Sequence, residues 1–229
     1  MLSNFPFAAV LWDMDGTLID SEPLWIEQER ELMESLGAIW THDDAIHCLG
    51  GPMTRVDAYM RDKLPQIHQD SFPPLELARL LLERMELRLS QKVPFTSGSF
   101  ELISEMKSLG IPLALVSAST RPLMNAALKS IGEDIFHVTI SDSEVTRSKP
   151  DPEGYLKAAH SLSVDITNCL VIEDSITGMN AAIASGAWVL GLPHVAELPV
   201  AEKVVHRHTL EGLSVSEISA LFDLVSERE

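Results

Sequence analysis

Two carboxylates stand two residues apart at the end of an apolar stretch near the start of the chain. Phe5 to Leu11 are almost wholly apolar, which predicts a strand that is buried on both faces. Because side chains alternate along a strand, Asp13 and Asp15 start on the same side. Gly16 then lets the chain leave the strand without a Cβ clash. Two crowded anions repel each other unless a cation or a proton lies between them, so the pattern indicates a hard metal ion and phosphate chemistry.

Three later groups of polar residues have the types that would complete such a site. They are the hydroxyl-bearing run Ser117-Ala118-Ser119, the cation Lys149 and the acidic pair Glu173-Asp174. Taken singly, these are explained equally well as a helix cap, a solvated loop charge and acidic residues before a helix. Asp15-Gly16 alone is likewise an ordinary turn pair. The joint occurrence of these three groups and the Asp13 and Asp15 pair, in this order, favours one phosphoryl-transfer site.

The second half of the chain predicts the elements that position these groups. Helical patterns alternate with short apolar runs, at 100–109, 111–116, 122–131, 137–140, 152–162, 169–172, 175–185 and 188–190, with a last helix over 214–225. This alternation predicts an α/β fold with a doubly wound parallel sheet and right-handed crossovers. Ligands bind in such sheets outside the carboxyl ends of the strands. The polar groups all follow predicted strands, so we expect them at one edge of the sheet.

The segment between Pro23 and Ser90 follows another pattern. Apolar residues recur there at helical spacing, and no strand pattern intervenes. Leu49-Gly50-Gly51-Pro52 predicts a break, and Thr54 is expected to cap the helix that follows it. An all-helical block directly after the first strand predicts an inserted module. We therefore expect an α/β core and a helical cap domain, with the bounds 1–20 and 93–229 for the core and 21–92 for the cap.

Composition excludes several classes of partner. Of the 229 residues, 45% are hydrophobic and 22% are charged, as in an ordinary globular protein. The net charge of −17 argues against nucleic acid and against anionic membranes, because both require a basic surface. Cys48 and Cys169 are too few for a disulfide framework and show no metal-ligand spacing. With no targeting signal and no membrane-spanning run, we expect a cytoplasmic protein, and the absence of a heptad pattern favours a monomer.

The residues 13–22, Asp-Met-Asp-Gly-Thr-Leu-Ile-Asp-Ser-Glu, resemble the first motif of the haloacid dehalogenase-like hydrolases. The likeness is to the branch that includes sugar phosphatases and β-phosphoglucomutase. Ser117 matches the second motif of the family, Lys149 the third and Glu173-Asp174 the fourth, so the resemblance covers nearly the full chain. It implies a Rossmann-like core with an inserted cap, and Mg²⁺-dependent hydrolysis of small phosphorylated metabolites. Asp20 to Trp25 look most like the hexose-phosphate phosphatases of the family.

The resemblance also implies a role for each matching residue. Asp13 would attack phosphorus and form an aspartyl-phosphate, and Asp15 would give a proton to the leaving oxygen. Lys149 would neutralise the Asp13 carboxylate and the phosphate oxygens. The Mg²⁺ ligands implied are Asp13, the backbone carbonyl of Asp15, Glu173 and Asp174. The substrate-binding residues expected in the core are Gly16, Ser117, Ala118 and Ser119.

The helical insert would supply the remaining contacts. A lid that closes over the sheet edge excludes water and brings substrate contacts with it. Arg55 is the leading candidate for such a contact, because a guanidinium can grip hydroxyl or phosphate oxygens, although an exposed helix arginine explains it equally well. Trp25 is expected to line the pocket, with a core tryptophan as the alternative.

Three other functions compete with a sugar-phosphate phosphatase. A phosphomutase of the β-phosphoglucomutase kind would use the same aspartyl-phosphate, but that branch usually has a histidine where Trp25 stands and a lysine where Thr120 stands. Dehalogenation fits less well, because Asp15 and the acidic pair suit phosphate. A non-catalytic protein that binds phosphorylated metabolites would not need the complete set of motif residues.

Overall fold

The structure is a computed structural model that describes residues 5–69, 71–193 and 197–226. The chain divides into two compact units. The first, here called the core unit, comprises Met1–Asp20, Pro94–Met124 and Ile131–Glu229. The second, the helical unit, comprises Ser21–Val93 and Asn125–Ser130, so it takes in part of helix α7 Arg121–Ile131.

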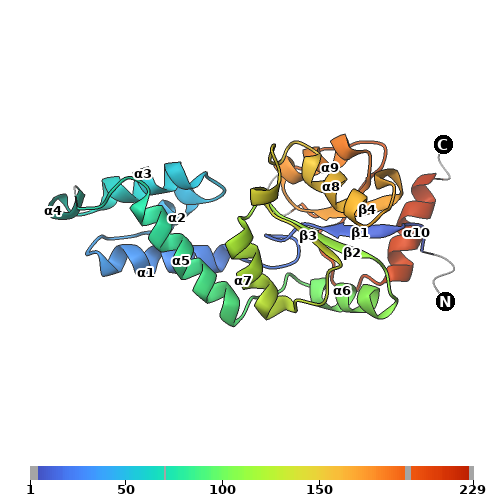
Figure 1. Cartoon of the computed structure of the whole chain (residues 1–229), viewed down its shortest axis with the longest axis horizontal. Coiled ribbons are helices and arrows are strands. Elements are labelled where there is room, and N and C mark those ends of the chain that lie inside the picture. Colours follow the sequence, from blue (N-terminus) through green and yellow to red (C-terminus); the bar gives the residue numbers. More distant parts are fainter. Residues whose placement is uncertain (1–4, 70, 194–196, 227–229) are drawn as a thin grey trace. The chain divides into compact units, whose positions relative to one another are not determined.

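A six-stranded parallel sheet forms the centre of the core unit, with the strand order β3-β2-β1-β4-β5-β6 (Figure 1). The strands are β1 Ala9–Trp12, β2 Leu113–Val116, β3 Val138–Ile140, β4 Cys169–Glu173, β5 Trp188–Gly191 and β6 Val204–His206. The predicted doubly wound α/β fold is confirmed. β1 lies at the centre of the sheet, between β2 and β4. The strands that follow it in the chain extend the sheet first on one side, as far as β3, and then on the other side, as far as β6, so the strand order reverses at β1.

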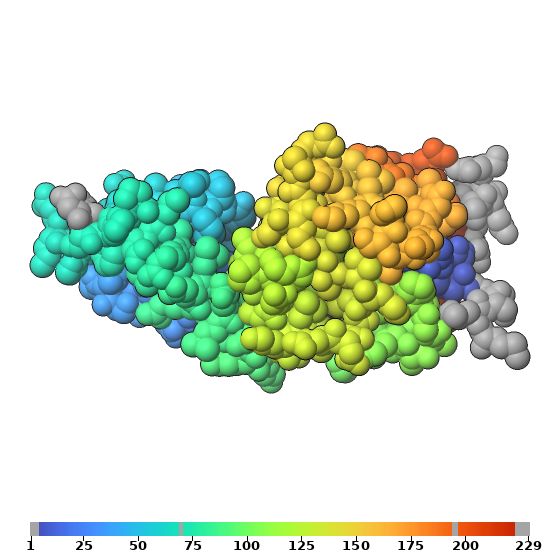
Figure 2. All heavy atoms as spheres, viewed as in Figure 1, coloured from blue at the N-terminus to red at the C-terminus, as the bar shows by residue number. Residues whose placement is uncertain are grey.

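Helices cover both faces of this sheet. The helices are α6 Ser99–Ser108, α7 Arg121–Ile131, α8 Glu153–Ser161, α9 Ile176–Ser185 and α10 Val215–Ser226, with short 3₁₀ turns at Asp142–Glu144 and Ile166–Asn168. Helices α8 and α9 lie on one face and α6 on the other (Figure 1). Figure 2 shows the yellow-orange and orange atoms of this part of the chain packed into one continuous surface. Small side chains such as Ala158 and Ala182 allow this close packing, and β1 and β4 are completely buried in consequence.

The helical unit contains no strand among residues 21–69 and 71–93, which agrees with the sequence pattern. Its helices are α1 Glu22–Ser35, α2 His42–Cys48, α3 Met53–Lys63, α4 Gln66–Gln69 and α5 Glu76–Gln91. Helices α1 and α3 both pack on α5. Apolar residues spaced by three or four positions, such as Leu81 and Met85, are fully buried between them. No helix in the described part of the chain is both long and apolar enough to cross a membrane.

The first strand is shorter than the sequence predicts. β1 begins at Ala9, not at Phe5. Ala9 pairs with Cys169, where β4 itself begins, so the residues before it have no strand beside them. Pro6 also lacks the N–H that a ladder would use. Phe7 is nevertheless buried, against the rings of Trp188 and Phe222.

One expectation for the helical unit is wrong, and one helix of this unit and one strand of the core were not predicted. Thr54 does not cap α3, because the N-cap of this helix is Pro52 and Thr54 lies in its first turn. Helix α2 was not predicted, although Thr41 and Asp44 form a reciprocal capping box at its start. Strand β6 follows β5 without a helical pattern between them in the sequence, so the alternation of helices and strands did not indicate it. The break at 49–52 does separate two helices.

Candidate active site

The carboxylates of Asp13 and Glu173 come together because their strands are neighbours. Asp13 follows the last residue of β1, and Glu173 is the last residue of β4. The Asp13 backbone N–H donates to the carbonyl of Ile172 at 3.0 Å, which fixes the two strand ends side by side. The Asp13 residue is 7% exposed and Glu173 is fully buried. Two acidic groups are therefore held next to each other with little access to water.

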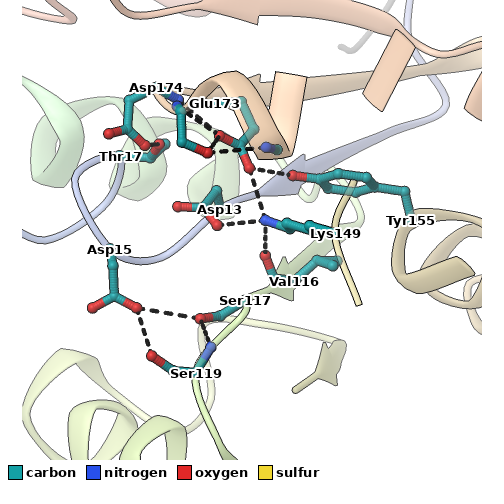
Figure 3. A network of polar contacts seen from close by, with 12 residues as sticks. Asp13, Asp15, Thr17, Val116, Ser117, Ser119, Lys149, Tyr155, Glu173 and Asp174 are labelled. Atoms are coloured by element: carbon teal, nitrogen blue, oxygen red, sulfur yellow. Dashed lines mark hydrogen bonds and ion pairs between the residues drawn. The ribbon is translucent and has the colours of Figure 1, made fainter. Parts of the chain in front are cut away.

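Lys149 supplies the positive charge between them (Figure 3). Its ammonium donates to Asp13 Oδ1 at 2.5 Å, to Glu173 Oε1 at 2.8 Å and to the carbonyl of Val116 at 3.0 Å. An ammonium has three protons, so these contacts use all of its donors. Burial by itself would lower the pKa of Lys149, but the neighbouring Asp13 and Glu173 carboxylates outweigh burial and hold this pKa well above its ordinary value. Lys149 is therefore a charged, fully hydrogen-bonded counter-ion.

One ammonium does not compensate the whole acidic cluster. Burial raises the pKa of Asp13 well above its ordinary value, and the neighbouring Glu173 and Asp174 carboxylates raise it further, against the effect of Lys149. Each of the three acidic residues offers an oxygen within 4.8 Å of the others. Excess negative charge and an all-oxygen donor set are the conditions under which a hard divalent cation binds.

Asp174 is oriented from the opposite side by the first motif. The buried Thr17 hydroxyl donates to Asp174 Oδ1 at 2.7 Å. Gly16 has a φ of +84°, and a Cβ at this position would lie 2.2 Å from Asp174 Oδ2. Gly16 is therefore required both by its backbone conformation and by the close approach of this carboxylate.

Glu173 accepts hydrogen bonds on both of its carboxylate oxygens. Its Oε2 accepts from the backbone N–H groups of Asp174 and Ser175, both at 3.0 Å, and from the Ser175 hydroxyl at 3.1 Å. Its Oε1 accepts from Lys149 at 2.8 Å and from the Tyr155 hydroxyl at 3.0 Å. A Cβ on Gly178 would lie 1.5 Å from Oε1, so only glycine leaves room for this arrangement. The buried charge is thus matched by donors on both oxygens.

The Asp15 side chain points to a separate group of hydroxyls (Figure 3). Its Oδ2 accepts from the Ser119 hydroxyl at 2.8 Å and from the Ser117 hydroxyl at 3.3 Å. The Ser119 N–H in turn donates to the Ser117 hydroxyl at 2.9 Å, and Ala118 between them is exposed. The core residues expected from the sequence therefore fall into two adjacent groups, one around Lys149 and one around the Asp15 carboxylate.

The two remaining expected residues belong to the helical unit. Trp25 lies on α1 and is half-buried. Arg55 lies on α3 and is exposed, and its guanidinium donates to the carbonyl of Leu49 at 3.2 Å. This guanidinium rests on Gly51, where a Cβ would lie 2.1 Å from Nη2. Arg55 is therefore folded back on the 49–52 break.

Thr17, Tyr155 and the Val116 carbonyl were missed by the sequence analysis. Thr17 lies within the first motif, two residues after Asp15, and this closeness in the sequence was the signal that could have identified it. Tyr155 stands six residues after Lys149 in a helix that is otherwise rich in small residues, which indicates burial but no partner. A backbone carbonyl leaves no signal in the sequence, because every residue carries one.

Comparison with known proteins assigns the family. The family model of the haloacid dehalogenase-like hydrolases matches residues 10–192, so the chain belongs to this family, as its motifs indicated. Hexitol phosphatase B of Escherichia coli is 31% identical over 77% of this chain and 79% of its own length. The bifunctional riboflavin kinase/FMN phosphatase of Arabidopsis thaliana is 29% identical over 81% of this chain, which spans 48% of that longer protein. The crystal structure of a hydrolase of this family from Deinococcus radiodurans, with bound phosphate and sodium, is 26% identical, covers 97% of each chain and has a TM-score of 0.67.

Proposed function

We propose that this protein is a Mg²⁺-dependent phosphatase that hydrolyses small phosphorylated metabolites, sugar phosphates in particular, through an aspartyl-phosphate. The observation that carries this proposal is the contact of the buried Asp13 carboxylate with the Lys149 ammonium, beside two further carboxylates. Relatives whose names describe them as phosphatases of hexitols and of FMN support the same class of reaction.

The acidic cluster fits Mg²⁺. The oxygens of Asp13 and Asp174 would hold the ion together with the backbone carbonyl of Asp15, and Glu173 belongs to the same cluster. Both Glu173 oxygens already accept hydrogen bonds. Glu173 would therefore have to lose one of these hydrogen bonds to bind the ion directly. When bound, Mg²⁺ neutralises phosphoryl oxygens and the crowded carboxylates.

Asp13 and Asp15 would carry out the two half-reactions. In the first, an Asp13 oxygen forms a bond to phosphorus while the bond from phosphorus to the ester oxygen breaks, and Asp15 gives its proton to that oxygen. In the second, water forms a bond to phosphorus and loses a proton to Asp15, and the bond between phosphorus and Asp13 breaks. Inorganic phosphate leaves, and both carboxyl groups return to their initial states.

Charge and positioning would provide most of the rate acceleration. Lys149 would favour the ionised form of Asp13 against the effect of burial, and it orients this carboxylate through the contact at 2.5 Å. The Ser117 and Ser119 hydroxyls hold Asp15 before catalysis. With the Gly16 and Ala118 backbones, the same serines would bind the phosphoryl oxygens once substrate enters.

The helical unit would act as the cap. We propose that residues 21–92 close over bound substrate, with Arg55 and Trp25 as contacts to its hydroxyl or phosphate oxygens and to its carbon skeleton. Replacement Arg55→Ala should raise KM for the best substrate about tenfold and change kcat less, because a ground-state contact is lost. Replacement Arg84→Ala is the matched control on the same unit. Equal KM values for both variants would remove Arg55 from the binding site.

A phosphomutase is the second candidate, since it would use the same aspartyl-phosphate. Trp25 and Thr120 stand where that branch usually has a histidine and a lysine, which favours hydrolysis. Incubation of β-glucose 1-phosphate with a trace of the corresponding bisphosphate separates the two: a mutase yields the 6-phosphate isomer, and a phosphatase yields free phosphate. The monomeric state and the cytoplasmic location stay predictions from the sequence.

The proposal is tested by phosphate release. The wild-type protein should hydrolyse p-nitrophenyl phosphate with Mg²⁺ and lose this activity in EDTA, and Asp13→Asn should serve as the inactive control. A panel of hexose, pentose, hexitol and flavin phosphates then identifies the substrate class. Absence of phosphate release from every compound, with each of Mg²⁺, Mn²⁺ and Co²⁺, would refute the phosphatase function and leave a binding protein.

A further inference from the structure

Tyr155 contacts both Lys149, which binds the proposed nucleophile Asp13, and Glu173, which shares that lysine. It lies on α8 and is completely buried. Its hydroxyl donates at 3.0 Å to Glu173 Oε1, the same oxygen that accepts from Lys149 at 2.8 Å. Tyr155 therefore competes with Lys149 for the lone pairs of one carboxylate oxygen.

The ring of Tyr155 contacts the same ammonium. Lys149 Nζ lies 4.9 Å from the ring centroid, a distance at which a cation is attracted by the π face. The Lys149 side chain is only 8% exposed, so this contact replaces water. The hydroxyl of Tyr155 is fixed by Glu173 while its ring faces Lys149, and both contacts restrict where the ammonium can lie.

The sharing of Glu173 Oε1 decides how strongly Lys149 is drawn to each of its acceptors. With the Tyr155 hydroxyl in place, part of the charge on Oε1 is satisfied, and Lys149 keeps its short contact with Asp13 Oδ1. Without this hydroxyl, Glu173 would attract Lys149 more strongly, and the contact with Asp13 would lengthen.

We propose that Tyr155 is a positioning residue that fixes Lys149 on the Asp13 carboxylate through Glu173 Oε1 and through its own ring. This inference rests on the proposed function for its kinetic consequence, but its structural content concerns only Tyr155, Glu173 and Lys149. Tyr155 would not touch the substrate or the transferred phosphoryl group, and it would act only through the lysine.

The chain offers a matched control, because it has two tyrosines. Tyr59 in the helical unit donates to Asp44 Oδ1 at 2.8 Å, and Lys63 Nζ lies 5.1 Å from its ring centroid. Tyr155→Phe and Tyr59→Phe therefore remove the same O–H from the same kind of tyrosine, carboxylate and lysine cluster. Only the first cluster contains a residue proposed for catalysis.

The first measurement is kinetic. Tyr155→Phe should lower kcat for p-nitrophenyl phosphate about tenfold and change KM less than about twofold, the size expected when a hydrogen bond to a charged group is lost. Tyr155→Leu, which also removes the ring, should lower kcat further. Tyr59→Phe should leave both constants within about twofold of wild type.

The second measurement does not depend on activity. In protein labelled with ¹⁵N-lysine, the buried Lys149 ammonium should give a separate NMR signal, identified by its loss in Lys149→Arg. This signal should shift and broaden in Tyr155→Phe, more so in Tyr155→Leu, and stay unchanged in Tyr59→Phe. Circular dichroism verifies that each variant is folded.

The outcomes separate this inference from the proposed function. If the wild-type protein releases no phosphate, the phosphatase function fails, and the NMR comparison still tests Tyr155. If the wild-type protein is active and Tyr155→Phe matches Tyr59→Phe in kcat, the inference is overturned. It is also overturned if kcat falls while the Lys149 signal stays at its wild-type position, because Tyr155 would then act without the lysine.

Discussion

The core unit and the helical unit each contain a tyrosine, a carboxylate and a lysine in nearly the same arrangement. In the helical unit, the Tyr59 hydroxyl lies 2.8 Å from Asp44 Oδ1, and Lys63 Nζ lies 2.6 Å from the same oxygen. In the core unit, the corresponding distances to Glu173 Oε1 are 3.0 Å from Tyr155 and 2.8 Å from Lys149. Each lysine also faces the ring of its tyrosine.

The two clusters differ in the exposure of the lysine side chain and in the other hydrogen bonds that the carboxylate accepts. The Lys63 side chain is 40% exposed, whereas that of Lys149 is 8% exposed. Asp44 also accepts from the Thr41 hydroxyl and N–H, which closes the capping box of α2. Hydrogen bonding, first from Lys63 and then from Thr41, holds the pKa of Asp44 far below its ordinary range. Every charge there is satisfied, so the cluster stabilises a helix start.

The clusters also differ in charge balance. In the helical unit, Lys63 is paired with Asp44 alone among the described residues. Lys149 faces both Asp13 and Glu173, with Asp174 in the same cluster. An unbalanced buried charge is costly for folding, but it attracts a cation and an electrophile. The same three chemical groups therefore stabilise a helix start in one unit, and in the other they surround the carboxylate that we propose as the nucleophile.

Replacement of a carboxylate from each cluster should give the largest contrast. Asp13→Asn keeps the shape of the side chain but removes the nucleophile, so turnover should fall by more than about 10³-fold. Asp44→Asn should leave kcat within about twofold and lower the melting temperature instead. Phosphate release and thermal unfolding measure the two effects. Substantial turnover by Asp13→Asn would indicate direct attack by water.

Replacement of the lysines should give the next largest contrast. Lys149→Met leaves Asp13 and Glu173 without their counter-charge, and we expect a loss in kcat of about 10³-fold together with lower stability. Lys63→Met removes a half-exposed partner of a single carboxylate, and kcat should change less than about twofold. Comparable kinetic losses in the two variants would contradict the distinction between the clusters.

Asp15 tests whether the second group in the core has a chemical role of its own. Asp15→Asn removes the acid and base but retains an acceptor for Ser117 and Ser119, so kcat should fall about 10²-fold, in the range that general acid–base catalysis provides. The loss should be smaller for a substrate with a good leaving group, such as p-nitrophenyl phosphate, than for a sugar phosphate. An unchanged kcat for both substrates would remove Asp15 from the mechanism.

Glu29 sharpens the comparison, because among the described residues this buried carboxyl has no hydrogen bond or ion pair with a lysine or a tyrosine. The Glu29 residue is 5% exposed, and its Oε2 makes no hydrogen bond. Burial raises its pKa from the ordinary value of 4.5 to about 7, although the nearby Trp40 indole opposes this shift. Between these two pH values the unfolded chain releases the proton while the folded chain retains it. Stability therefore falls as pH rises through this window and levels off above about pH 7.

The variant Glu29→Gln removes this dependence. Its stability relative to wild type should rise by about 2 kcal/mol between pH 5.5 and pH 8, which corresponds to 1.36 kcal/mol for each pKa unit crossed. Urea unfolding followed by circular dichroism at the two pH values measures the difference. Asp44→Asn should show no such trend, because the Asp44 carboxyl that it replaces is ionised throughout this range in both the folded and the unfolded chain. A parallel pH dependence of Glu29→Gln and wild type would show that Glu29 is not protonated in the folded protein.

The sequence predicted much of the fold and the charged residues that the structure brings together in the core unit. Alternating helices and apolar runs identified five of the six strands, including the three-residue β3. Strand β6 was missed because it follows β5 without a helical pattern between them in the sequence, and β1 was extended too far toward the N-terminus because apolar residues also fill the space beside a sheet. Helix α2 was missed because its seven residues are too few for a clear periodicity, although Thr41 and Asp44 form a capping box at its start.

By themselves, the residue types and their order determined that the polar residues of the site lie at or beyond strand ends: Asp13, Asp15, Ser117, Lys149 and the acidic pair at 173–174. Only the tertiary structure decided how they share hydrogen bonds. The pairing of β1 with β4 positions Asp13 beside Glu173, and helix α8 places the ring of Tyr155 against the Lys149 ammonium. Such contacts join residues far apart in the chain, and their strength depends on burial. A local sequence pattern contains no information on the distance between two side chains or on whether water is excluded from around them.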